Sequence, residues 1–149
     1  MTTSTTSTPQ GAADAAAVPP RPAGETSDSP HRSGQPMHGA ARAFDLLGEL
    51  DALRAEPSWQ QRDRNAKTLV HEPGFRVVLT ALKTGARLGE HASHGQFSVQ
   101  TITGRLRVHV AGRAVELPTG QLLSVEGGAD HDLEALEESA FLLTIAGPR

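Results

Sequence analysis

The sequence predicts an all-β domain, a sandwich or barrel of short strands, preceded by one amphipathic α-helix. After Arg64, short apolar runs follow one another and are separated at close spacing by turn residues, mostly glycine and proline. This is the pattern of antiparallel strands joined by tight turns. In RLRVHV the residues alternate strictly, so that Leu106, Val108 and Val110 share one face and the charged side chains share the other.

Seven apolar runs are the predicted strands. They are Thr68–Val70, Phe75–Leu82, Phe97–Thr103, Leu106–Val110, Leu122–Val125, Leu133–Leu136 and Phe141–Ile145. The part of the chain from Arg64 onward is long enough for one small barrel and no second domain.

The helix is expected over residues 41–56. Its apolar stripe follows the i, i+1, i+4, i+7 spacing of an amphipathic helix and consists of Leu46, Leu47, Leu50 and Leu53. Charged residues, Glu49 among them, lie mostly off this stripe, and Pro57 discourages continuation of the helix. The stripe packs either against the sheet or against a second copy of the chain.

Residues 1–40 are predicted to form a disordered, low-complexity tail. They are mostly Thr, Ser, Ala, Pro and Gly, and they contain six of the ten prolines. Such a segment buries too little apolar surface to offset the entropy lost on ordering. Met37 is the only methionine besides Met1, which makes it an alternative start of translation.

Composition excludes several classes of function. The chain has 14 Lys and Arg against 17 Asp and Glu, so it lacks the basic footprint of a protein that binds nucleic acid or anionic membranes. It has no cysteine, which excludes disulfides and thiolate metal sites. No apolar run approaches the roughly 20 residues that span a bilayer, and the amino terminus lacks the features of a secretory signal. We therefore expect a cytoplasmic protein.

Among the seven histidines, His131 has the clearest orientation. In DHDLEAL it shares a face with Leu133 and Ala135, so we expect it to point into the barrel. There it is either a metal ligand or a core histidine bonded to a backbone carbonyl or water. His109 lies on the charged face of its strand and is expected to face solvent.

The stretch EHASHGQF carries His91 and His94 at a spacing of three. In an extended strand these two side chains point to opposite faces. Both could bind one ion only if the chain bends between them, and Gly95 would help such a bend.

Residues 85–131 resemble the two signature motifs of the cupin family. The first motif runs glycine, five residues, His-x-His, then a glutamate and a closing glycine, and it is matched at Gly85, His91 and Gly104. In the second motif a glycine precedes Pro-x-Gly and a histidine, and GQLLSVEGGADHDLEA matches it at Gly120, Gly128 and His131. The resemblance covers residues 65–147. It implies a jelly-roll barrel, a small-molecule ligand and a homodimer.

Four positions depart from the motifs. Ser93 takes the place of the second histidine and Phe97 that of the glutamate ligand, while Glu126 and Ala135 replace the proline and asparagine of the second motif. Only His91 and His131 match ligand positions residue for residue. The resemblance therefore implies a degenerate metal site.

Strand parity leaves two arrangements open around Phe97. If the family's parity holds, Phe97, Val99 and Thr101 point inward and Gln100 points outward; a bulge at Gly95 would reverse this. The residues expected to bind a small ligand are Phe97, Gln100, His91 and His131. The residues expected to bind a metal are His91, His94 and His131.

Three functions follow from these observations. The first is a barrel without a complete catalytic site that binds a small ligand, with or without one divalent transition metal (Zn, Fe, Ni or Mn). The second is a metal-dependent cupin oxygenase, isomerase or lyase. Arg87, Arg105 or Arg107 would then bind a carboxylate substrate; the alternative is that these arginines lie on solvated strand faces. The third is a metal-free homodimeric structural barrel. No catalytic residue is identifiable from the sequence.

Overall fold

The computed structural model describes residues 36–37, 41–92 and 94–147, without the side chains of residues 36, 37 and 90–92. The predicted tail therefore lies outside the described residues, apart from the two-residue strand β1 (Pro36–Met37), which pairs with β2 (Ala41–Arg42). In the part of the chain that is described, no helix has the length and apolar character needed to cross a membrane.

Two short helices precede the barrel. Helix α3 (Leu46–Ala55) begins after Asp45, whose carboxylate accepts a hydrogen bond from the backbone nitrogen of Gly48 at 3.1 Å. This N-cap starts the helix five residues later than predicted. Helix α4 (Pro57–Gln61) begins at Pro57, because a proline suits the first turn of a helix but cannot continue the one before it.

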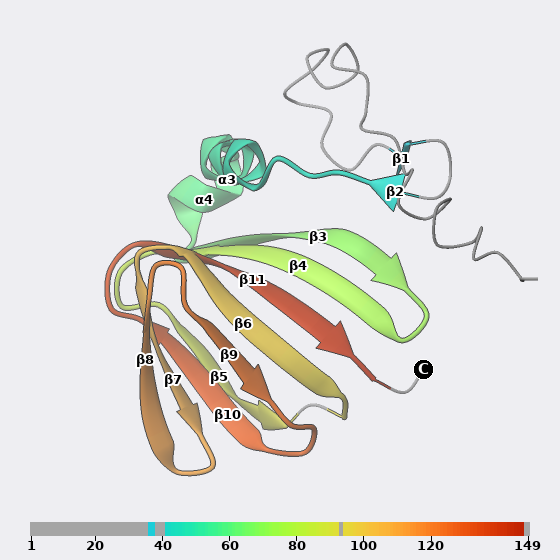
Figure 1. Cartoon of the computed structure of the whole chain (residues 1–149). Helices are drawn as coiled ribbons and strands as arrows, with labels where there is room; N and C mark the ends of the chain where they lie inside the picture. The colour runs from blue at the N-terminus through green and yellow to red at the C-terminus, as the bar shows by residue number, and fades with distance from the viewer. Residues whose placement is uncertain (1–35, 38–40, 93, 148–149) are drawn as a thin grey trace, which may run out of the picture. The chain divides into compact units, whose positions relative to one another are not determined.

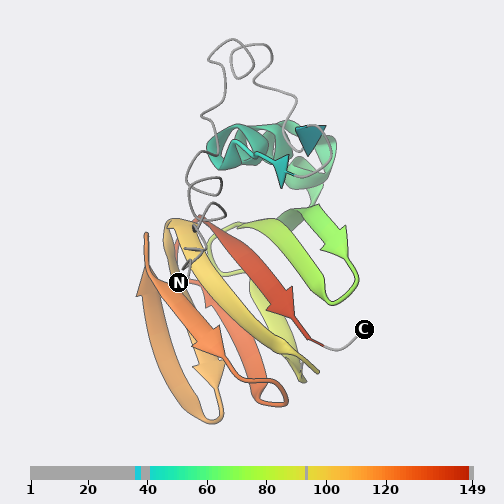
Figure 2. The ribbon, with the colours of Figure 1, turned by 45° about the vertical axis from the view of Figure 1, so that its right-hand side comes forward.

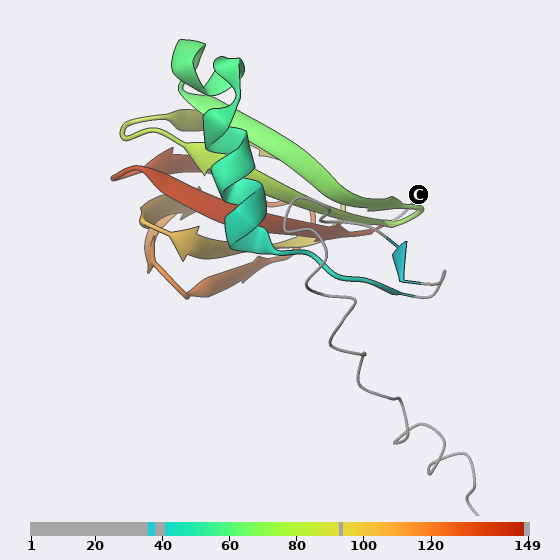
Figure 3. The same ribbon diagram turned by 90° about the horizontal axis from the view of Figure 1, so that it is seen from above.

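Helix α3 packs on the outer face of the sheet that contains β4 and β11 (Figure 3). Leu50 and Leu53 are each 2% exposed and join Trp59 in an apolar cluster with that sheet. Leu47, however, is 59% exposed. One residue step turns a helix by about 100°, so Leu47 lies beside the stripe and not on it.

Glu49 is an exception to the pattern that places the charged residues of the helix mostly off the apolar stripe. Its side chain is only 4% exposed, and its Oε1 accepts a hydrogen bond from Nζ of Lys67 at 2.7 Å. Lys67 lies on β3 (Arg64–Glu72), eighteen residues further along the chain. A strand far away in sequence therefore supplies the partner that allows a carboxylate to be buried.

The barrel consists of two antiparallel sheets that face each other (Figures 1 and 2). The five-stranded sheet has the order β3-β4-β11-β6-β9, and the four-stranded sheet the order β5-β10-β7-β8. Their remaining strands are β4 (Phe75–Leu82), β5 (Arg87–Ala92), β6 (Gln96–Thr103), β7 (Arg105–Val110), β8 (Arg113–Pro118), β9 (Leu122–Val125), β10 (Asp130–Ala135) and β11 (Ser139–Ala146). The jelly-roll prediction is confirmed.

Each of the seven predicted runs overlaps a strand. The two barrel strands outside these runs, β5 and β8, are the two edges of the four-stranded sheet. Edge strands bury less apolar surface, and RLGEHA and RAVELP show correspondingly weak alternation. The strand that carries His91 was therefore not among the predicted apolar runs.

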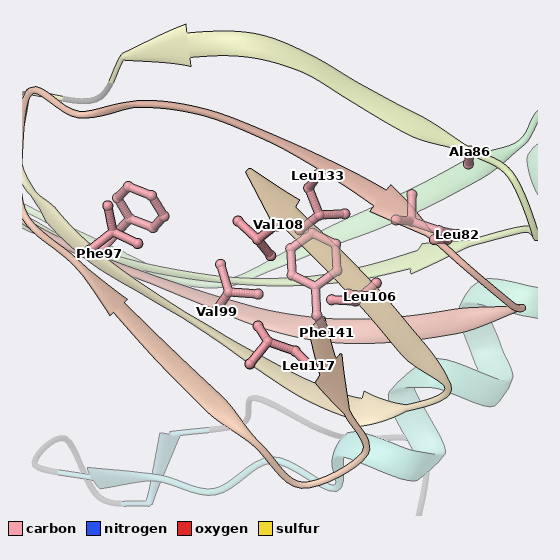
Figure 4. Packing of buried hydrophobic residues seen from close by; sticks show 11 residues of the cluster. Leu82, Ala86, Phe97, Val99, Leu106, Val108, Leu117, Leu133 and Phe141 are labelled. Carbon is pink, nitrogen blue, oxygen red and sulfur yellow. The ribbon is translucent and has the colours of Figure 1, made fainter. Parts of the chain in front are cut away.

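The core between the sheets is an apolar cluster (Figure 4). Alternate residues of the strands point into it, including Phe97, Val99, Leu106, Val108, Leu133 and Phe141. In Figure 4, Phe97 lies at one end of this cluster, and Leu82 and Ala86 lie at the other. The candidate site is at the Phe97 end.

Leu53→Ala is expected to lower the free energy of unfolding by about 2–5 kcal/mol, because it opens a cavity under helix α3. Leu47→Ala removes the same side chain from an exposed position on the same helix and is expected to change stability by less than about 0.5 kcal/mol. Equilibrium urea unfolding measures both. Equal losses in the two variants would contradict the packing of α3 on the sheet.

Candidate functional site

His131 lies on β10 and points into the barrel, as predicted. Its side chain is buried, with 8% of the residue exposed, and its Nδ1 is 3.0 Å from the backbone oxygen of Ala129. A carbonyl can only accept, so Nδ1 carries the hydrogen in this bond. In the neutral ring Nε2 is then the acceptor nitrogen, which is the form of histidine that binds a metal or accepts a hydrogen bond from a ligand.

Phe97 packs directly against this imidazole. The two ring centroids are 4.4 Å apart and the rings are tilted by 42°. Phe97 is 4% exposed and lies on β6 in the opposite sheet. An aromatic ring thus occupies the position where the resemblance to cupins implies a carboxylate.

Burial along β6 decides between the two predicted parities. Phe97, Val99 and Thr101 are all buried, so the inward parity holds. Gln100 lies on the other face of the sheet, in register with Leu142 on β11, which belongs to the cluster under the helices. The alternative with Gln100 inside the barrel is not the one observed.

The backbone brings positions 91 and 131 together. Strands β5 and β10 are antiparallel neighbours, and their register sets His91 directly opposite His131. Directly opposite positions in an antiparallel pair are the closest cross-strand neighbours. The side chain of His91 lies outside the described residues, so its predicted role stays a prediction.

His94 belongs to a different part of the barrel. The chain leaves the four-stranded sheet at Ala92 and enters the five-stranded sheet at Gln96, with a bend at His94 and Gly95 between them. A Cβ atom on Gly95 would lie 2.5 Å from the backbone oxygen of Ala146, so a side chain has no room here. The chain thus bends at His94 and Gly95, where the sequence indicated only that Gly95 would help a bend.

The bend leaves His94 exposed, beside the turn between β3 and β4. Within the described side chains, no three His, Asp or Glu groups come close enough together to hold a metal ion. The described part of the predicted three-histidine set is thus split between the barrel interior, at His131, and a pocket near the β3–β4 turn, at His94.

The outer face of the four-stranded sheet carries paired charges. His109 lies on this outer face, as expected, with 37% of its side chain exposed, and its Nδ1 lies 2.7 Å from a carboxylate oxygen of Asp132. Arg87 and Arg107 both pair with Glu134, and Arg105 pairs with Glu116. The three arginines therefore lie on a solvated, ion-paired strand face, as expected.

A pocket of about 550 Å³ near the β3–β4 turn contains residues that were not singled out from the sequence. Arg76, Phe75 and His71 line it together with His94 and Ile145. Parity in FRVVLTAL offered one signal for Arg76, which alternates with Val78, Thr80 and Leu82 and so shares their barrel-facing side. Phe75 precedes Arg76 on β4, while His71 comes from β3, Ile145 from β11 and His94 from the bend before β6.

Solved structures show which fold this is. The chain is similar to a conserved protein of unknown function from Streptococcus pyogenes, with a TM-score of 0.59 and 23% identity over 73% of this chain and 90% of that one. It is also similar to a cupin superfamily protein from Desulfitobacterium hafniense, with a TM-score of 0.55 and 13% identity over 56% and 77% of the two chains.

The chain folds as a small cupin-type domain.

A third similar structure is the Cupin_2 domain of an XRE family transcriptional regulator from Enterobacter cloacae. This chain matches all of that domain with 59% of its own length, at a TM-score of 0.54 and 22% identity. No family model matches the sequence, and no curated protein matches it. The assignment of the cupin-type fold therefore rests on structural similarity together with the glycine framework of the two motifs.

Proposed function

We propose that this chain is a non-catalytic cupin-type module that binds a small organic molecule at the end of the barrel where Phe97 meets His131. The observation that carries the proposal is the ring contact at 4.4 Å. An aromatic face next to an imidazole suits a ligand with a flat apolar body and one hydrogen-bonding group.

The chemistry of this end of the barrel supports binding over catalysis. Phe97 supplies neither a proton nor a metal ligand where the resemblance implies a carboxylate. Phe97 belongs to the buried hydrophobic cluster of the barrel, together with Val99 and Val125. A general acid or base needs a titratable group within hydrogen-bond reach of the reacting atom, and at this end His131 is the titratable group that the described core contains.

A fragment titration followed by NMR tests the proposal. Aromatic fragments that carry one hydrogen-bond donor should shift the imidazole ¹⁵N signals of His131, and His131→Gln and Phe97→Leu should each weaken binding about tenfold or more. His109→Gln is the matched control, because that imidazole lies on the outer sheet face beside Asp132. Fragments that bind equally well to all variants would contradict the proposal, as would a wild-type barrel that binds none of them.

A second candidate is a metal centre that includes two histidines, with or without catalysis. The register that sets His91 opposite His131 favours it, because neutral imidazole is the commonest side-chain metal ligand. Elemental analysis of the wild-type chain and the His131→Ala variant separates the two functions. A transition metal retained near one per chain and lost in the variant would favour the metal centre.

Self-association into a homodimer stays a prediction, which size exclusion with light scattering can check.

A further inference from the structure

We infer that the pocket at the β3–β4 turn is a second binding site, for a small organic carboxylate with an apolar body, and that Arg76 binds the carboxylate. This pocket is distinct from the place where Phe97 and His131 meet. Its volume of about 550 Å³ is in the range of small-molecule sites.

The pocket is built on the barrel-facing side of the five-stranded sheet. Register aligns His71 with Arg76, Arg76 with Ile145, and Ile145 with Phe97, which makes one row across four strands. Directly opposite residues share a face of a sheet. Arg76 and His71 thus stand on the same face as the core, at the end of the row, and Ile145 separates them from Phe97.

Arg76 supplies a positive charge that no carboxylate neutralises among the described residues. Its Nη2 lies 3.5 Å from Nε2 of His71. The one acidic residue that lines the pocket, Glu72, is bound by Arg42 at 2.7 Å. The pocket therefore presents a guanidinium and two imidazoles, of His71 and His94, and its one acid is already paired.

The apolar side chains that line the pocket favour an organic carboxylate over inorganic phosphate. Phe75 is 43% exposed, which is unusual for a phenylalanine, and it lines the pocket together with the partly buried Ile145. An arginine fork matches the two oxygens of a carboxylate, while the phenyl ring and the isoleucine favour an apolar body attached to it. Inorganic phosphate would use the charge but leave the apolar walls unfilled.

Titration of the full chain with sodium benzoate at constant ionic strength, followed by ¹H–¹⁵N NMR, tests the inference. Benzoate should cause saturable shifts at His71, Arg76 and His94, and Arg76→Gln should raise its Kd about tenfold or more. Arg113→Gln is the matched control, because Arg113 is also an exposed strand arginine without an ion pair among the described residues but lies on the other sheet. Its Kd for benzoate should equal that of the wild type.

Two further ligands and one further variant sharpen the test. Phosphate and benzyl alcohol should each bind more weakly than benzoate, since phosphate lacks the apolar body and benzyl alcohol lacks the carboxylate. His131→Gln should leave benzoate binding at Arg76 unchanged, which keeps the result independent of the function proposed above. The inference is overturned if benzoate gives no saturable shift, if Arg76→Gln binds it as well as the wild type, or if phosphate binds as tightly as benzoate.

Discussion

Gly104→Ala is expected to destabilise the barrel by about 2–5 kcal/mol, from the left-handed backbone and from steric overlap. Gly104 joins β6 to β7 with a φ of +87°. A Cβ atom here would meet the Oγ of Ser139 and the backbone oxygen of Glu138, and would lie 2.7 Å from Cα of Ser139. Ser139 cannot move aside easily, because it is fully buried and its Oγ accepts a hydrogen bond from the backbone nitrogen of Arg105 at 3.0 Å.

Gly112→Ala is the matched control for this effect. Gly112 lies in the turn between β7 and β8 with a φ of +79°, but no heavy atom lies within 4 Å of the position of its Cβ. The Gly112→Ala variant should be destabilised only by the cost of a left-handed backbone at an alanine, about 1–2 kcal/mol. Urea unfolding of both variants measures the difference. If both alanines cost the same, close packing of Ser139 on Gly104 is not what constrains this position.

Phe97→Glu is expected to have the largest effect on the chemistry of the barrel. Without metal, the variant should be less stable by roughly 3–5 kcal/mol, because it loses a buried aromatic ring and places a carboxylate in an apolar core. With Zn²⁺ or Ni²⁺, the carboxylate and His131 can share one ion, so metal binding should restore stability and affinity should rise on the order of tenfold or more over the wild type. Thermal unfolding with and without metal, together with elemental analysis, measures both effects.

Val99→Glu controls for the simple burial of charge. Val99 is 2% exposed and lies on the same face of β6, one step deeper in the core than Phe97. Its variant should be destabilised as well, but metal should not rescue it. The double variant Phe97→Glu with His131→Ala should also lose the rescue. If metal fails to rescue Phe97→Glu, position 97 does not correspond to the ligand position of the cupin motif.

Local patterns predicted the strands and their faces with good success. Leu106 and Val108 were assigned to the core from alternation alone, and burial confirms both of them. For Phe97 two orientations were open, and only its burial in the folded barrel decided between them. The helix stripe was predicted with one leucine too many, since Leu47 is exposed. Periodicity identifies the apolar direction of an element but not how wide a strip its neighbour will cover.

The sequence by itself determined which residues face the interior where alternation is strict, as at Leu106 and Val108, because the side chains of a strand alternate between its two faces. It also determined, through the cupin motifs, that His131 and position 97 belong to one end of a barrel. Only the tertiary structure decided which residues meet there. It placed Phe97 on His131, set His91 opposite His131, moved His94 to another pocket, and assembled that pocket around Arg76. Those contacts join residues on different strands and depend on register, which is set by the packing of the whole barrel and not by any local run of the chain.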